Sequence, residues 1–142
     1  MLKAGVKAPA LKCLDGGKPV VLAFFKVSCP VCQMTFPYLE RMSRNEKIAF
    51  FAISQDDAAA TRAFYGQFGI TFPTLLDEKK ERYPASNAYG ITSVPSLFLV
   101  ECDGTISMAF DGFSKRDLER IGERAGVKPF KPEDNVPEWK PG

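Results

Sequence analysis

Histidine is absent from this sequence of 142 residues, and its absence excludes several kinds of active site. Neither a Ser-His nor a Cys-His catalytic pair can form, and no metal site can use an imidazole ligand. The side chains left for catalysis are cysteines, carboxylates, lysines and tyrosines. The four cysteines are too few for a small domain held together by disulfides. A catalytic site must therefore be built from these remaining side chains.

Long apolar runs and a marked charge excess are also missing. The longest apolar run, Pro19–Phe25, is far too short to span a membrane. The 19 basic and 17 acidic residues nearly balance and form no basic run, so we expect no nucleic-acid surface. The first residues, "MLKAGVKAPA", lack the apolar core of a signal peptide. We expect a cytoplasmic protein if the chain is complete, and a periplasmic or otherwise extracytoplasmic one if a leader was removed.

Apolar runs alternate with segments of helical pattern along the chain. The pattern predicts strands at Pro19–Val27, Lys47–Ser54, Thr74–Leu76, Ser96–Val100 and Thr105–Phe110, and helices from Pro30 to about Arg44, over Ala58–Phe68, over Lys79–Tyr89, and from a Ser114 cap through Arg124. This order predicts an α/β fold with a central mixed sheet and an antiparallel hairpin at its edge, flanked by helices on both faces. We expect a single domain over residues 1–125, with an irregular lead-in over residues 1–18.

Residues 126–142 differ in composition from the rest of the chain. They contain four prolines and the only tryptophan, Trp139. Two structures are consistent with this Pro-rich C-terminal tail: a frayed extended segment, or a strap whose Phe130 and Trp139 pack on the domain.

Two cysteines separated by two residues, Cys29 and Cys32, stand between a predicted buried strand and a predicted helix. Pro30 and Val31 fit the first helical turn, with Cys29 near the N-cap. At that place the helix dipole and free N–H groups stabilise a thiolate on Cys29. The spacing also brings the two sulfurs close enough to bond. A strand–CxxC–helix unit of this kind is typical of thioredoxin-like redox chemistry.

Two other interpretations of the pair are simpler. Cysteine is often a small buried hydrophobe, and a lone CxxC can serve packing alone. A metal site would need two more ligands, and only Cys13 and Cys102, neither part of a second CxxC, are available. We therefore expect no metal site, and we expect Cys13 and Cys102 to be spectators, although a disulfide between them stays open.

Further motifs lie around and beyond the cysteine pair. Pro37 follows Cys29 by eight residues, the segment "TFPTLLD" precedes "YGITSVPSLFLVECDGTI" with its Val94-Pro95 step, and Gly112 follows the last strand. With "FFKVSCPVC", these motifs make residues 5–125 resemble the thioredoxin superfamily and, within it, the TlpA/ResA-like thiol–disulfide oxidoreductases. The segment Gln55–Asp77 resembles the extra strand–helix insertion of TlpA- and peroxiredoxin-type domains.

The resemblance implies a role for each site residue. Cys29 would be the exposed nucleophile and Cys32 the buried resolving cysteine. The Val94-Pro95 bond would be cis and face the cysteines, and the Val94 backbone would bind an extended partner segment. The redox-active disulfide would be the only cofactor. Partners would be protein dithiols or disulfides and an upstream reductant, and we expect a monomer without a membrane span.

The sequence departs from its relatives where they carry an acid. Thioredoxins commonly place an aspartate where this chain has Ala23, and TlpA-like proteins often place a glutamate where it has Thr35. Asp56 and Glu40 are possible substitutes, neither of them assigned, and water could carry the proton instead. Lys26 could lower the thiolate pKa, but a solvated lysine at a strand end is the favoured interpretation.

The sequence thus predicts a thiol–disulfide oxidoreductase acting on protein partners. One alternative is a thiol peroxidase, but the positions that need proline and Thr/Ser in peroxiredoxins hold Leu22 and Lys26. Another is a non-catalytic thioredoxin-like interaction domain. Copper-delivery relatives of this fold bind through a histidine, which this chain lacks.

Overall fold

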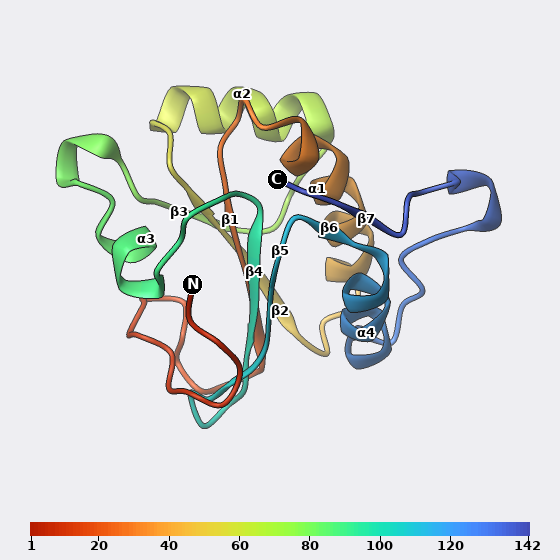
Figure 1. The fold of residues 1–142 in the computed structure, drawn as a ribbon, viewed down its shortest axis with the longest axis horizontal. Coiled ribbons are helices and arrows are strands. Elements are labelled where there is room, and N and C mark those ends of the chain that lie inside the picture. Colours follow the sequence, from red (N-terminus) through yellow and green to blue (C-terminus); the bar gives the residue numbers. More distant parts are fainter.

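A five-stranded mixed sheet forms the centre of the protein in the computed structural model, which describes all 142 residues (Figure 1). Its strands are β1 (Val20–Phe25), β2 (Ala49–Ser54), β3 (Thr74–Leu76), β4 (Ser96–Val100) and β5 (Ile106–Asp111), in the spatial order β3-β2-β1-β4-β5. β1, β2 and β3 are parallel, whereas β4 runs antiparallel to both β1 and β5. The β4–β5 hairpin therefore forms one edge, and β4 begins at the end of the sheet where β1 finishes.

Both faces of the sheet are covered, which explains why the run in β1 is apolar at every position. The helices are α1 (Pro30–Ser43), α2 (Ala58–Phe68), α3 (Pro84–Tyr89) and α4 (Lys115–Ala125). Side chains of α1, α2 and α4 pack on one face of the sheet with Val21, Ala23 and Phe25. α3 and the lead-in segment cover the other face. None of the helices combines the length and the hydrophobicity needed to cross a lipid bilayer.

The single helix predicted over Lys79–Tyr89 is wrong. The structure has a short 3-10 helix at Lys79–Glu81 and a separate α3 that begins at Pro84. Arg82 and Tyr83, between them, both adopt positive φ angles. The break follows from Pro84, which lacks an N–H and is suited to the first turn of a helix rather than to its interior.

Residues 126–142 run back along the domain as a strap, which we name the C-terminal strap. Phe130 packs its ring against Tyr38 at 4.8 Å between centroids. Farther along, β7 (Trp139–Lys140) pairs antiparallel with β6 (Phe113–Ser114), after a short 3-10 turn. Phe130 thus packs as the strap hypothesis predicted, whereas Trp139 does not, because 61% of its surface is exposed.

Candidate active site

The two cysteines of the CxxC motif lie at the first turn of α1, just beyond the end of β1. Cys29 is the N-cap residue, and its sulfur accepts a hydrogen bond from the backbone N–H of Cys32 at 3.1 Å. Pro30 occupies the first helical position, where its missing N–H costs nothing. Cys29 is partly exposed and Cys32 is fully buried. The two thiols therefore differ in solvent exposure, although they are only one helical turn apart.

This position makes Cys29 acidic. Its pKa is lowered from the ordinary 9.0 to about 6, chiefly by a hydrogen bond from the Cys32 thiol. The backbone N–H groups of Cys32 and Val31 lower the pKa further, and partial burial opposes them. Cys29 is consequently a thiolate at neutral pH, which is the nucleophilic form of cysteine.

Cys32 is shifted in the opposite direction. Burial raises its pKa most, and the hydrogen bond to Cys29 raises it further. The negative charges of the Cys29 thiolate and of Asp56 add to this, while a hydrogen bond from the Lys26 backbone opposes it. The reduced pair therefore carries one negative charge, and that charge resides on the exposed sulfur.

The Val94-Pro95 loop faces the exposed cysteine, and its peptide bond is cis. When protonated, the Cys29 thiol donates a hydrogen bond to the Val94 carbonyl at 3.4 Å. The Gly112 N–H donates to the Pro95 carbonyl at 2.8 Å, which ties this loop to the end of β5. The structure thus brings the four predicted residues Cys29, Cys32, Val94 and Pro95 into one site.

No acid occupies the two positions where relatives carry one. Ala23 is buried in β1. Thr35 is also buried, and its hydroxyl donates to the Val31 carbonyl one turn back at 2.7 Å, so it is satisfied within the helix. Neither residue can therefore exchange a proton with Cys32.

The two candidate substitutes for this acid have different positions. Asp56 follows β2, accepts a hydrogen bond from the Val27 N–H at 2.8 Å, and acts electrostatically on Cys32. Glu40 instead accepts hydrogen bonds from the backbone N–H and the hydroxyl of Thr71, at 2.8 and 2.6 Å. Asp56 therefore belongs to the site, and Glu40 fastens α1 to the segment before β3.

The remaining candidates are a lysine next to the pair and two cysteines outside the site. Lys26 has an exposed side chain. Cys13 packs among the side chains on the opposite face of the sheet from Cys32, and Cys102 is exposed in the turn that follows β4. All four cysteines are free thiols, and nowhere do three or more cysteine or carboxylate side chains gather in a metal-binding group.

One feature of the site was not predicted from the sequence. Gly142 lies so close to the Val94-Pro95 loop that a Cβ built on it would overlap the Val94 carbonyl oxygen. The prolines of the strap indicated an extended chain. Nothing in its sequence indicates which surface the chain covers, because that depends on packing against residues far away in sequence.

The sequence is similar to those of known proteins. The sequence model described as "AhpC/TSA family" matches residues 4–109. Thiol-disulfide oxidoreductase ResA of Geobacillus kaustophilus (strain HTA426) is 27% identical over 118 residues, an alignment that covers 80% of this chain and 65% of the relative. Thioredoxin-like protein YneN of Bacillus subtilis (strain 168) is 28% identical over 138 residues, with 84% and 78% covered. This chain thus spans slightly less than two thirds of the length of the ResA relative.

Solved structures show the same fold. A putative thiol:disulfide interchange protein DsbE from Chlorobium tepidum superposes with a TM-score of 0.75 at 22% identity, covering 92% of this chain and 100% of that one. The thioredoxin domain of a thiol-disulfide oxidoreductase from Bacteroides vulgatus gives 0.76 at 20% identity, with 87% and 98% covered. The mixed sheet and its helices are therefore a thioredoxin-like fold.

Proposed function

Because this chain belongs to the AhpC/TSA family, we propose that it is a thiol–disulfide oxidoreductase that exchanges or reduces disulfides in protein partners. The observation that carries the proposal is the asymmetry of its two thiols. Cys29 is partly exposed with a pKa of about 6, and Cys32 is fully buried with a raised pKa. Such a pair has one thiolate that can attack a disulfide and one protonated thiol that can react in the following step.

In the proposed reaction, the Cys29 thiolate attacks one sulfur of a partner disulfide. A Cys29–partner bond forms, the partner's S–S bond breaks, and its other sulfur leaves as a thiolate that takes a proton from water. Cys32 then loses its proton and attacks the Cys29 sulfur. The Cys29–Cys32 disulfide forms as the Cys29–partner bond breaks, and the second partner sulfur leaves as a thiolate that takes up the proton lost by Cys32 through water. Two electrons have then passed to the partner.

The structure supplies a reason why Cys32 becomes reactive only at the second step. In the dithiol, the hydrogen bond to Cys29 and the negative charge of its thiolate both raise the pKa of Cys32. Both of these causes disappear once Cys29 is bonded to the partner, while burial, the largest cause of the raised pKa, remains. The pKa of Cys32 consequently falls in the mixed disulfide, where its attack is needed.

Val94 and Pro95 are the proposed partner-binding residues. The Val94 carbonyl lies at hydrogen-bonding distance from Cys29, so a segment that pairs with this backbone is held beside the reactive sulfur. The only cofactor in this scheme is the redox-active disulfide, and an upstream reductant restores the dithiol.

A thiol peroxidase is the weaker proposal. The position three residues before Cys29 holds exposed Lys26 instead of a hydroxyl side chain, and the expected proline position holds fully buried Leu22. Neither residue resembles the peroxide-binding pattern.

Reduction of insulin disulfides in the presence of dithiothreitol tests the proposal. The wild-type chain should accelerate insulin precipitation, and Cys29→Ser should give only the background rate. Cys102→Ser is the matched control, because it removes an exposed thiol outside the site and should leave the rate unchanged. Equal activity of the wild type and Cys29→Ser would refute the proposed function.

A further inference from the structure

The end of the C-terminal strap lies on the loop that carries the cis proline. A Cβ built on Gly142 would overlap the Val94 carbonyl oxygen and would lie 3.2 Å from Cδ of Pro95. The same Val94 carbonyl accepts the hydrogen bond from the Cys29 thiol. Figure 1 shows this end of the chain beside the start of α1. Gly142 therefore contacts the backbone that a partner segment would need.

The strap reaches this position as an extended strand. β7 pairs with β6, and the Lys115 N–H donates to the Glu138 carbonyl at 2.9 Å. Gly112 makes the close passage possible, because a Cβ there would lie 2.5 Å from the Lys140 carbonyl oxygen and 3.3 Å from Cα of Pro141. The strap thus ends against the loop whose backbone a partner peptide would pair with.

The strap is held firmly at its base and weakly at its tip. Near the base, Arg41 donates to the Pro129 carbonyl at 2.6 Å and forms an ion pair with Asp134 at 2.9 Å. At the tip, residues 140–142 are all exposed, and the β6–β7 ladder has only two residue pairs. Segments with few buried contacts open locally at low free-energy cost. The tip can therefore leave the loop while the base stays in place.

We propose that residues 140–142 occupy the partner-binding edge at Val94-Pro95 in the resting protein, and that an extended partner segment displaces them to reach Cys29. The proposal rests on the function proposed above. The strap and the partner compete for the same backbone. The apparent affinity for a peptide is therefore the intrinsic affinity multiplied by the fraction of molecules whose strap has left the loop. A small disulfide that needs no strand pairing is not subject to this reduction.

Two probes separate the two effects. One is 2-hydroxyethyl disulfide, which is small and neutral. The other is a short unstructured peptide whose cysteine carries a thionitrobenzoate leaving group, so that attack by Cys29 releases a coloured thiolate. We expect a chain shortened by residues 140–142 to react with the peptide about tenfold faster than the full chain, the factor for a site open a tenth of the time. With the small disulfide, the two chains should react equally fast.

Two further variants keep the result interpretable. Lys140→Ala removes only the lysine charge and leaves the backbone contact of this residue with Gly112, so it should react with the peptide at the rate of the full chain. Gly142→Val keeps the chain length, but its side chain would overlap the Val94 carbonyl and should displace the tip. It should therefore accelerate the peptide reaction in the same direction as the shortening.

The outcomes distinguish this inference from the function on which it rests. If the shortened chain reacts with the peptide no faster than the full chain, or more slowly, residues 140–142 do not compete with the partner and the inference is overturned. If neither chain reacts with either probe through Cys29, the proposed function itself fails.

Discussion

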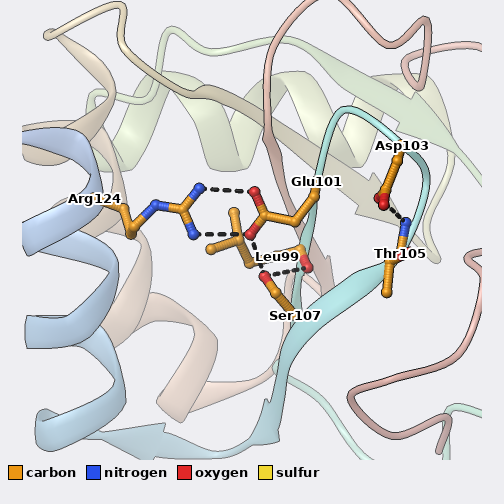
Figure 2. A network of polar contacts seen from close by, with 6 residues as sticks. All are labelled: Leu99, Glu101, Asp103, Thr105, Ser107 and Arg124. Atoms are coloured by element: carbon orange, nitrogen blue, oxygen red, sulfur yellow. Dashed lines mark hydrogen bonds and ion pairs between the residues drawn. The ribbon is translucent and has the colours of Figure 1, made fainter.

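Strand β4 has a charged group near each end, and the two charges are held in different ways. Past its last residue, Glu101 receives two hydrogen bonds from the Arg124 guanidinium at 2.8 and 2.7 Å and another from Ser107 (Figure 2). Before its first residue, the Val94 carbonyl faces Cys29, whose charge is stabilised by hydrogen bonds and not by a cation. The pKa is lowered at both places, chiefly by Arg124 for Glu101 and chiefly by the Cys32 thiol for Cys29.

The difference shows what makes one charge structural and the other reactive. A carboxylate bound by both arms of a guanidinium has its oxygens occupied and joins α4 to the sheet. A thiolate stabilised by hydrogen-bond donors at a helix N-terminus keeps a free, partly exposed sulfur. The same fold thus contains a charge pair that fixes geometry and an unpaired anion available for attack.

The largest effect is expected from removing the Cys32 thiol, next to the start of β4. Cys32→Ser keeps the first attack and removes the second, so oxidised glutathione should convert Cys29 almost completely into a lasting mixed disulfide. Peptide mass spectrometry would locate the added glutathione on Cys29, whereas the wild type should pass on to the internal disulfide. A variant that accumulates no adduct would contradict the assigned roles.

Glu40 is also a carboxylate that accepts hydrogen bonds, but unlike Glu101 it is buried and its donors are uncharged groups of Thr71. Glu40→Gln removes the charge that accepts two hydrogen bonds from Thr71, and should lower the free energy of unfolding by about 1–3 kcal/mol. Urea denaturation measures this loss. Disulfide exchange should be unchanged, and a large fall in its rate at unaltered stability would show that Glu40 acts in the site.

At the structural end, Arg124→Met should lower the free energy of unfolding by about 0.5–1 kcal/mol, because the pair is partly exposed. Glu101 has a folded pKa below its ordinary 4.5, so its stabilisation is present above that value and is lost as pH falls through the folded pKa. The difference between wild type and variant should therefore be constant from neutral pH to about 4.5 and shrink as pH falls further. A difference that also stays constant below that pH would exclude the ion pair as its cause.

The smallest effect is expected at Asp56. Its negative charge is among the minor causes that raise the pKa of Cys32, so Asp56→Asn should lower that pKa slightly. The pH dependence of the second step, the attack of Cys32 on a Cys29–glutathione disulfide, measures the shift. Asparagine can still accept the hydrogen bond from the Val27 N–H, which makes it a near-isosteric test of charge. A rise in the Cys32 pKa would be the contrary result.

The parts of the fold with local signals could be predicted from the sequence. The bounds Ala58–Phe68 are confirmed for α2, because Asp57 caps its start and Gly69 adopts the left-handed conformation at its end. The position of Cys29 at a helix N-terminus followed in the same way from its neighbours. The role of Pro84 was misjudged, because a proline can either interrupt a helix or begin one.

The remaining features depend on contacts between distant parts of the chain. Asp56 contacts Val27 just beyond the ends of the neighbouring strands β2 and β1, and Gly142 contacts Val94 after the strap has crossed the domain. No local sequence pattern predicts contacts between residues so far apart in the chain. The choice between Asp56 and Glu40, and the covering of the cis-proline loop, could therefore be made only in three dimensions.

The pH dependence of alkylation in the reduced wild-type protein tests the central claim most directly. Iodoacetamide reacts with thiolates, so the rate at Cys29, followed by peptide mass spectrometry, should rise with pH and reach half its maximum near pH 6, while buried Cys32 stays unmodified. A midpoint near the ordinary 9.0, or equal modification of the two cysteines, would contradict the account of an exposed thiolate beside a protonated, buried thiol.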